Sequence, residues 1–146
     1  MSDASGSVLS ISIVVYYPDA AWLTTTLESL VAALAHARRA GVMRRAQIFL
    51  VDNQSDSPDS PFTAQLQNTS KEFGWIETLT IAGHGNVGYG RGNNLAIDRC
   101  AASDFHLVLN PALKLNEDAL PTALMFCLSQ VDCSMVPPFP SPPNCS

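Results

Sequence analysis

The sequence predicts an α/β domain with a mostly parallel sheet flanked by helices. Segments typical of strands alternate with segments typical of helices, which is the pattern of a parallel sheet with helical connections. Apolar side chains fill both alternate sets of positions in the main strand segments, as in strands covered on two faces. The chain has 146 residues, of which 47% are hydrophobic and 14% charged. One domain with an apolar core is therefore expected.

The first strand and the first helix have the clearest signals. SVLSISIVVYY, from Ser7 to Tyr17, is rich in β-branched residues, and Pro18 ends it. Asp19 is a suitable N-cap for the helix that follows, which is predicted to end at Gly41. Apolar residues recur with helical spacing in this segment: Leu23, Leu27, Leu30, Val31 and Leu34.

Two further strand and helix pairs follow. AQIFLVDN (46–53) is predicted as a buried strand, and a short helix is predicted from about Phe62 to Glu72. WIETLTIAG (75–83) is predicted as the third strand. The next helix is predicted in NNLAIDRCAAS (93–103).

The last predicted elements are a strand in FHLVLN (105–110), which stops at Pro111, and a helix from about Asp118 to Gln130. The domain is predicted to span residues 7–136. The tail PPFPSPPNCS (137–146) has five prolines in ten residues, so it is expected to be disordered and outside the sheet.

Charge and cysteine content exclude several classes of protein. The net charge of -5 argues against a nucleic-acid binder. The four cysteines lack the spacing of a zinc site or a disulfide framework, so reduced thiols are expected. The N-terminus has no basic leader pattern, and no apolar run approaches the ~18 residues of a membrane span. The predicted location is the cytoplasm.

Four arginines lie close together and have two interpretations. Arg38, Arg39, Arg44 and Arg45 supply half of the eight Lys and Arg residues. They could complement the dipole at the end of the first helix. Alternatively, they could face anionic lipid headgroups, which would place the protein at the inner face of the membrane as a peripheral protein.

The polar ends of the predicted strands point to one site. Tyr16 and Tyr17, Asp52 with Asn53, a glycine-rich segment and Asn110 each follow a strand. In open parallel sheets, ligands bind beyond the carboxyl ends of the strands. These groups are therefore expected to converge on one edge of the sheet, and that edge is the predicted site.

The glycine loop, GHGNVGYGRGNN (83–94), contains a G-x-G-x-x-G pattern typical of dinucleotide sites. That pattern normally occupies the first strand–helix turn, and the next strand should end in an acidic residue. Here two strands precede the one that leads into the loop, and the next strand ends in Asn110. No Gly-Lys-Ser/Thr follows, as a P-loop requires. An NAD-binding Rossmann protein remains an alternative.

The rest of the glycine loop favours contact with phosphate or sugar. Glycines allow backbone N–H groups to approach an anion closely, and a helix N-terminus favours negative charge. Arg91 can pair with phosphate oxygens, and Asn86, Asn93 and Asn94 border the loop. The alternative is a mobile turn with asparagines in left-handed conformations, which explains the glycines but does not require Arg91 or the pair Asn93 and Asn94.

Four motifs in order resemble a known family. They are ISIVVYYPD, FLVDNQSDS, GNVGYGRGNNLAI and HLVLNPALKL, and together they cover about Ile11 to Leu115. This order is similar to the nucleotide-binding half of family 2 glycosyltransferases of GT-A fold. The resemblance is strongest to the bacterial rhamnosyltransferase-like branch, in which N-x-G-[FY]-x-x-G-N-N is followed by a strand ending in L-N-P-D.

The resemblance implies a nucleotide-diphospho-sugar as donor, dTDP-rhamnose or a related molecule. It implies a cell-surface polysaccharide or a lipid-linked glycan as acceptor. Tyr16 and Tyr17 would then lie beside the nucleoside, and Asp52 would accept hydrogen bonds from its base or ribose. The residues implied to border the diphosphate and the sugar are Asn86, Gly88, Arg91, Asn93 and Asn94.

Two departures from the family change the expectation. The metal-binding aspartate of L-N-P-D is replaced by Ala112, which leaves Asn110 as the remaining candidate ligand for the Mg²⁺ or Mn²⁺ that the family implies. Relatives also continue for roughly as many residues again, through an acceptor site and a catalytic base. The expectation is a truncated or frame-disrupted glycosyltransferase, GT-A in fold but incomplete at its C-terminus, with weak activity or none. The alternative is a non-catalytic, nucleotide-sugar-binding regulatory module.

Overall fold

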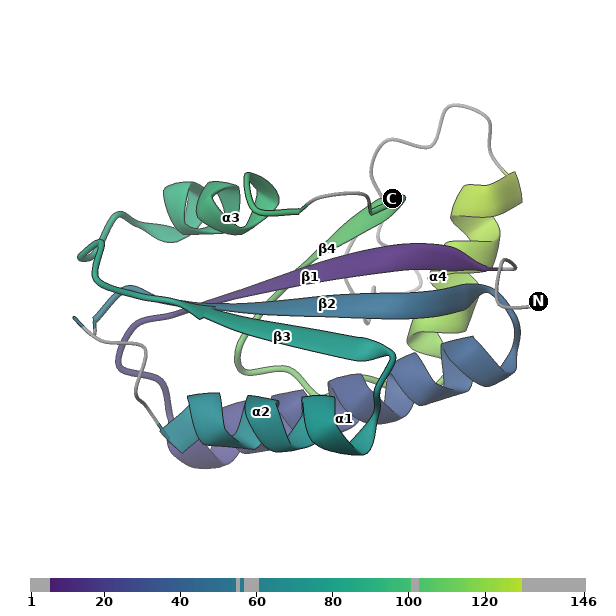
Figure 1. Ribbon diagram of the computed structural model, residues 1–146, viewed down its shortest axis with the longest axis horizontal. Coiled ribbons are helices and arrows are strands. Elements are labelled where there is room, and N and C mark those ends of the chain that lie inside the picture. Colours follow the sequence, from purple (N-terminus) through teal and green to yellow (C-terminus); the bar gives the residue numbers. More distant parts are fainter. Residues whose placement is uncertain (1–5, 55, 57–60, 101–102, 130–146) are drawn as a thin grey trace, which may run out of the picture.

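In the computed structural model, the chain forms a four-stranded parallel sheet between two layers of helices (Figure 1). The structure describes residues 6–54, 56, 61–100 and 103–129. The strand order is β3-β2-β1-β4. The elements are β1 (Ser7–Val15), α1 (Ala20–Arg39), β2 (Met43–Asp52), α2 (Pro61–Glu72), β3 (Ile76–Ile81), α3 (Tyr89–Ile97), β4 (Phe105–Leu109) and α4 (Ala119–Ser129).

The predicted α/β class and the order of strands and helices are confirmed, and the main correction concerns α3. This helix begins at Tyr89 and ends at Ile97, whereas the sequence predicted residues 93–103. The low helix propensity of glycine disfavours a helix that includes Gly90 and Gly92. Packing overrides that propensity, because a Cβ on Gly92 would lie 2.9 Å from Val14 Cγ1. The absence of a side chain there lets the helix approach the sheet.

Smaller corrections concern the ends of β1 and β2. β1 ends at Val15 and not at Tyr17, since Tyr17 adopts a positive φ of 48° that a strand does not allow. β2 begins at Met43 and not at Ala46, because Met43 pairs with Ser7 across the sheet.

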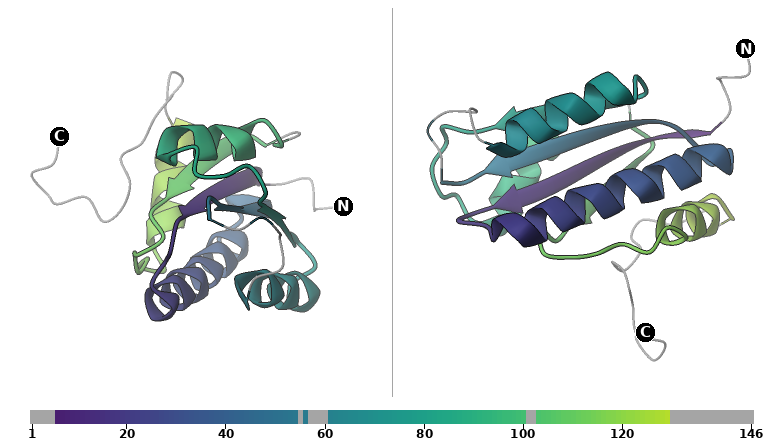
Figure 2. Two further views of the ribbon diagram at one scale, coloured as in Figure 1. Left: turned by 90° about the vertical axis from the view of Figure 1, so that its left-hand side faces the viewer. Right: turned by 90° about the horizontal axis from the view of Figure 1, so that it is seen from below.

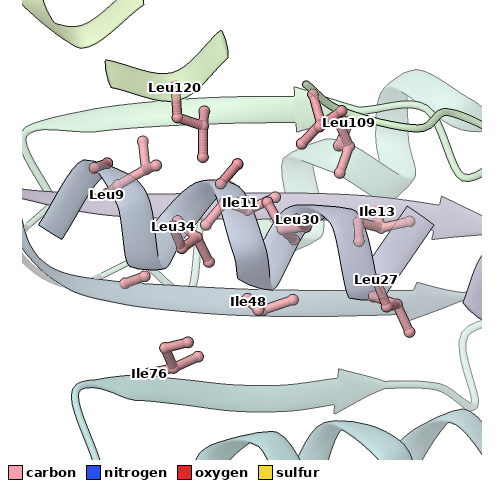
Figure 3. Close-up of a cluster of buried hydrophobic side chains, with 14 of the residues drawn as sticks. Leu9, Ile11, Ile13, Leu27, Leu30, Leu34, Ile48, Ile76, Leu109 and Leu120 are labelled. Carbon is pink, nitrogen blue, oxygen red and sulfur yellow. The ribbon is translucent and has the colours of Figure 1, made fainter. Parts of the chain in front are cut away.

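One face of the sheet, called here the apolar face, is covered by α1, α2 and α4 (Figures 1 and 2). Asp19 caps α1 as predicted, since its Oδ1 accepts a hydrogen bond from the Trp22 N–H at 3.1 Å. Burial of the apolar stripe of α1 then anchors the helix on the strands. The side chains labelled in Figure 3 form the centre of this core: Leu9, Ile11, Ile13, Leu27, Leu30, Leu34, Ile48, Ile76, Leu109 and Leu120.

The opposite face, called here the α3 face, is covered by α3 and has a different composition (Figure 2). A small apolar cluster lies under the helix and consists of Val14, Phe49, Val51, Ile81 and Ala96. Beside it, β1 directs the hydroxyls of Ser10 and Ser12 to this face, and both serines are fully buried. The two faces of β1 therefore differ in polarity, although both are buried.

The four arginines at 38, 39, 44 and 45 lie at the end of α1 and the start of β2, at the opposite end of the sheet from the predicted site. Arg38 lies in the last turn of α1, as the dipole interpretation expects, and its guanidinium lies 5.1 Å from the centre of the Trp75 ring. Arg45 forms an ion pair with Glu77 at 2.8 Å. Contact with a membrane surface stays a prediction.

Cys100 is a free cysteine, and its Sγ donates to the Ala96 carbonyl at 3.2 Å. The reduced state of the cysteines stays a prediction. Cys133, Cys145 and the tail 137–146 lie outside the described residues. Within the described ranges, no helix has both the length and the apolar character needed to cross a bilayer.

Candidate functional site

The carboxyl ends of the four parallel strands meet at one edge of the molecule, at the left of Figure 1. The chain runs outward from β1 to β2 and β3, and then returns to the other side of β1 as β4. α1 and α2 cover the apolar face, whereas α3 covers the opposite face (Figure 2). The edge between β1 and β4 is therefore a topological switch point, the usual ligand position in open α/β sheets.

The loops after β1 and β2 are joined by a glutamine side chain. Gln54 donates its backbone N–H to Asp52 Oδ1 at 3.0 Å, and its own Oε1 accepts the backbone N–H of Tyr17. Tyr16 and Tyr17 are both exposed, and their rings pack edge to face with centres 4.7 Å apart. The structure thus brings these three predicted site residues together, with the Asp52 carboxylate buried and the aromatic rings facing solvent.

Asn53, the residue after β2, organises the first half of the glycine loop. Its Nδ2 donates to the Gly88 carbonyl at 3.2 Å and lies 3.5 Å from Asn86 Oδ1. Because Asn53 donates through Nδ2, its Oδ1 is the acceptor, and His84 Nε2 donates to Asn53 Oδ1 at 2.7 Å. Asn53 is only 3% exposed and was not among the predicted ligand-binding residues. The available signal was its position directly after Asp52, at the end of a buried strand.

The N-terminus of α3 is left without a side-chain cap. Gly88 is the N-cap residue, with φ of 88° and ψ of 172°, and it has no side chain to accept a hydrogen bond from the N–H groups of the first turn. This backbone region is essentially restricted to glycine. Asn86 Oδ1 accepts the Gly88 N–H at 3.2 Å, which orders the approach to the helix. α1, whose first turn is capped by Asp19, provides the contrast. The first turn of α3 therefore offers backbone donors to an anion.

The remaining predicted residues of the glycine loop lie on α3 and divide into two groups. Arg91 and Asn94 are exposed. Asn93 is buried against the sheet, where its Nδ2 donates to the Tyr89 carbonyl at 3.1 Å. Arg91 is therefore available to a ligand at this end of α3, while the Asn93 side chain is engaged inside the protein.

The two residues at the position that the resemblance implies for a metal offer little to bind one. Asn110 follows β4 at the predicted edge, but its Oδ1 accepts the backbone N–H of Ala112 at 2.8 Å. Ala112 has no side-chain oxygen. Among the residues that the structure describes, no group of three His, Cys, Asp or Glu side chains could hold a metal ion.

Comparison with known proteins gives a likeness in fold. No protein-family model and no curated protein matches the chain. The crystal structure of S. aureus TarS, residues 1–349, matches with a TM-score of 0.57 at 18% sequence identity. The match covers 89% of this chain and 38% of that one, so the chain spans about two fifths of the TarS structure. The chain thus has an α/β fold of GT-A type that is like the matching part of TarS.

Proposed function

We propose that this chain is a glycosyltransferase domain that binds a nucleotide-diphospho-sugar at the carboxyl edge of its sheet. One observation carries the proposal: the uncapped N-terminus of α3, preceded by the glycine loop, opens at the edge where β1 and β2 end in Tyr16, Tyr17 and Asp52. The likeness to TarS, which is a GT-A-type glycosyltransferase, supports a nucleotide sugar as the class of ligand. The proposed donor is dTDP-rhamnose or a close relative.

Each part of the proposed site matches one part of such a donor. The diphosphate would contact the backbone N–H groups at the start of α3 and the Arg91 guanidinium, which supplies positive charge at the helix end. The base would pack against Tyr16 or Tyr17, whose exposed rings offer apolar surface. Asp52 would accept hydrogen bonds from the base or the ribose.

A second candidate function is a binding or regulatory module without turnover. It is favoured by Ala112, which lacks the carboxylate expected from the family pattern. A departing nucleotide diphosphate needs its charge neutralised. The described residues supply Arg91 and helix N–H groups for this but no metal-binding cluster. Donor binding with weak transfer, or none, is the proposed behaviour of this chain alone.

A thermal-shift titration of the whole chain tests the proposal. The ligands are dTDP-rhamnose, dTDP and UDP, each with and without Mn²⁺, and NADH is the comparison for a dinucleotide site. A ligand present at 100 times its Kd should stabilise the fold by about 2.7 kcal/mol, which is readily detected. We expect stabilisation by at least one nucleotide diphosphate and none by NADH.

Two arginines provide a matched control. Arg91 lies at the start of α3 and Arg99 just beyond its end, and both are exposed. Arg91→Ala and Arg99→Ala change the net charge equally, so a general electrostatic effect would appear in both. We expect only Arg91→Ala to weaken binding. No stabilisation by any nucleotide, or equal loss in the two variants, would refute the proposed site.

A further inference from the structure

A chain of polar side chains crosses the α3 face, from β4 through β1 to α3. Ser10 and Ser12 lie on β1 and are fully buried. His106 lies on β4 and pairs with Ser10 in register, so its ring reaches both hydroxyls. Asn93 lies above them on α3. Buried polar groups of this kind are costly unless each one has a partner.

The donor and the acceptor of each hydrogen bond in this chain of side chains follow from the last bond, which ends at the Tyr89 carbonyl. The Tyr89 carbonyl can only accept, so Asn93 donates to it through Nδ2 at 3.1 Å and presents Oδ1 to the sheet. Ser12 Oγ lies 2.6 Å from that Oδ1 and must donate its proton there. Ser12 therefore accepts from His106 Nε2–H at 2.9 Å. His106 Nδ1 is left as an acceptor for the Ser10 hydroxyl at 2.7 Å.

We propose that His106 is a positioning residue for the glycine loop and acts through Ser12 and Asn93. The chain of bonds ends at Tyr89, the first residue of α3, directly after the N-cap Gly88. It thereby fixes the start of α3, the part that bears the donors for an anion. The consequence for ligand binding rests on the proposed function, while the consequence for loop geometry does not.

The two serines differ in what their loss would leave unpaired. Without the Ser12 hydroxyl, His106 Nε2–H and Asn93 Oδ1 both lose their partner, and no other side-chain contact joins them within the described residues. Without the Ser10 hydroxyl, His106 Nδ1 loses a donor, although Cys100 Sγ lies 3.6 Å from it, and Ser103 Oγ and the Phe105 carbonyl lose contacts of 3.0 and 3.3 Å. None of these groups lies between His106 Nε2 and the Tyr89 carbonyl. Ser12→Ala should therefore disturb the loop, and Ser10→Ala should not.

The experiment compares these two variants in the whole chain. Amide hydrogen exchange measured by NMR reports opening of residues 88–93, and the imidazole nitrogen shifts report the tautomer of His106. We expect protonated Nε2 and unprotonated Nδ1 in the wild type. Ser12→Ala should speed exchange in the loop about tenfold, as expected for loss of a buried hydrogen-bond partner, while Ser10→Ala leaves it unchanged.

Two substitutions at His106 give a second, independent test. A Gln side chain can place an amide N–H near the position of Nε2, whereas Asn reaches only the position of Nδ1. His106→Gln should therefore preserve slow loop exchange, and His106→Asn should lose it. Equal exchange in Ser12→Ala and Ser10→Ala, or a proton on Nδ1 instead of Nε2, would overturn the inference.

Titration of the same variants with dTDP and UDP links the loop to the ligand. If nucleotide binds, we expect Ser12→Ala to weaken it about tenfold and Ser10→Ala to leave it intact. If the wild type binds neither nucleotide, the proposed function fails. The exchange results then still support or overturn the positioning role of His106.

Discussion

The two faces of the sheet bury similar strands in different ways. On the apolar face, leucine and isoleucine side chains from β1, β2, β3 and β4 meet α1, α2 and α4. On the α3 face, a small apolar cluster lies beside buried serines and a half-buried histidine. Apolar burial is non-directional, whereas hydrogen bonds fix orientation. One face therefore stabilises the domain, and the other positions the glycine loop as proposed above.

The largest expected loss of stability comes from a substitution on the apolar face. Leu34 is fully buried on α1, and Leu34→Ala should lower the free energy of unfolding by about 2–5 kcal/mol, through lost transfer energy and a residual cavity. Urea denaturation measures the change. The control is Leu79→Ala on the α3 face, where the side chain is 42% exposed and little effect is expected. A larger loss for Leu79→Ala would reverse the proposed division of roles.

A smaller effect is expected where α3 touches the sheet. Gly92→Ala would place a Cβ 2.9 Å from Val14 Cγ1, and overpacking of this kind costs about 1–3 kcal/mol. Gly90→Ala is the matched control on the same helix, because a Cβ there meets nothing within 4 Å and alanine favours the helix. Urea denaturation should therefore show opposite signs for the two variants.

The double variant Gly92→Ala/Val14→Ala makes this comparison sharper. If the clash with Val14 causes the loss, the double variant should be more stable than the sum of the single changes predicts. Simple additivity would show that α3 does not depend on this close approach.

A third test compares the two helix starts that face the site. Asp19→Ala removes the side-chain cap of α1 and should cost about 1 kcal/mol. Asp19→Asn keeps a side-chain oxygen and should cost much less. Both variants should leave nucleotide binding unchanged, because the anion is proposed to bind at α3 and not at α1. Thermal unfolding gives the stability, and the dTDP titration gives the binding.

The smallest effect is a pH dependence from the α3 face. Burial lowers the pKa of His106 below its ordinary value of 6.5, so the folded protein resists protonation there. Below about pH 6.5 the unfolded chain binds the proton more readily, and stability should fall until the pH passes the pKa of the folded state. At higher pH both states are neutral, and this contribution is constant.

Comparison of the wild type with His106→Gln isolates this contribution from the other histidines. Urea denaturation at several values between about pH 8 and about pH 5 should give a steeper decline for the wild type. Parallel curves would show that His106 does not contribute to the pH dependence of stability.

The order of strands and helices followed from the sequence, because apolar periodicity and capping residues act locally. Asp19 and the leucines of α1 are examples, and the convergence of Asn53 with the glycine loop followed from strand direction alone. The start of α3 did not follow from the sequence, because it depends on the close approach of Gly92 to Val14, and these residues are far apart in the chain.

The hydrogen bonds inside the site also could not be predicted from patterns in the sequence. Ser12 contacts both Asn93 and His106, each more than 80 residues away in sequence, and hydrogen bonds of this range leave no periodic signal. Asn53 lay at a predicted edge, but only the folded loop shows that it holds Gly88 and His84. Whether Tyr16, Tyr17, Asp52 and Arg91 contact a nucleotide stays a prediction.

The strand order also has a practical consequence. Within the described residues, β3 and β4 each pair on one side only, so their outer edges are templates on which another strand could add. The β3 edge carries the exposed carboxylate of Glu77, and β4 is only five residues long. Charge and shortness both discourage edge-to-edge aggregation. If concentrated samples of the protein form fibrils or precipitate, a lysine in place of Val108, which is already exposed, is the first remedy to test.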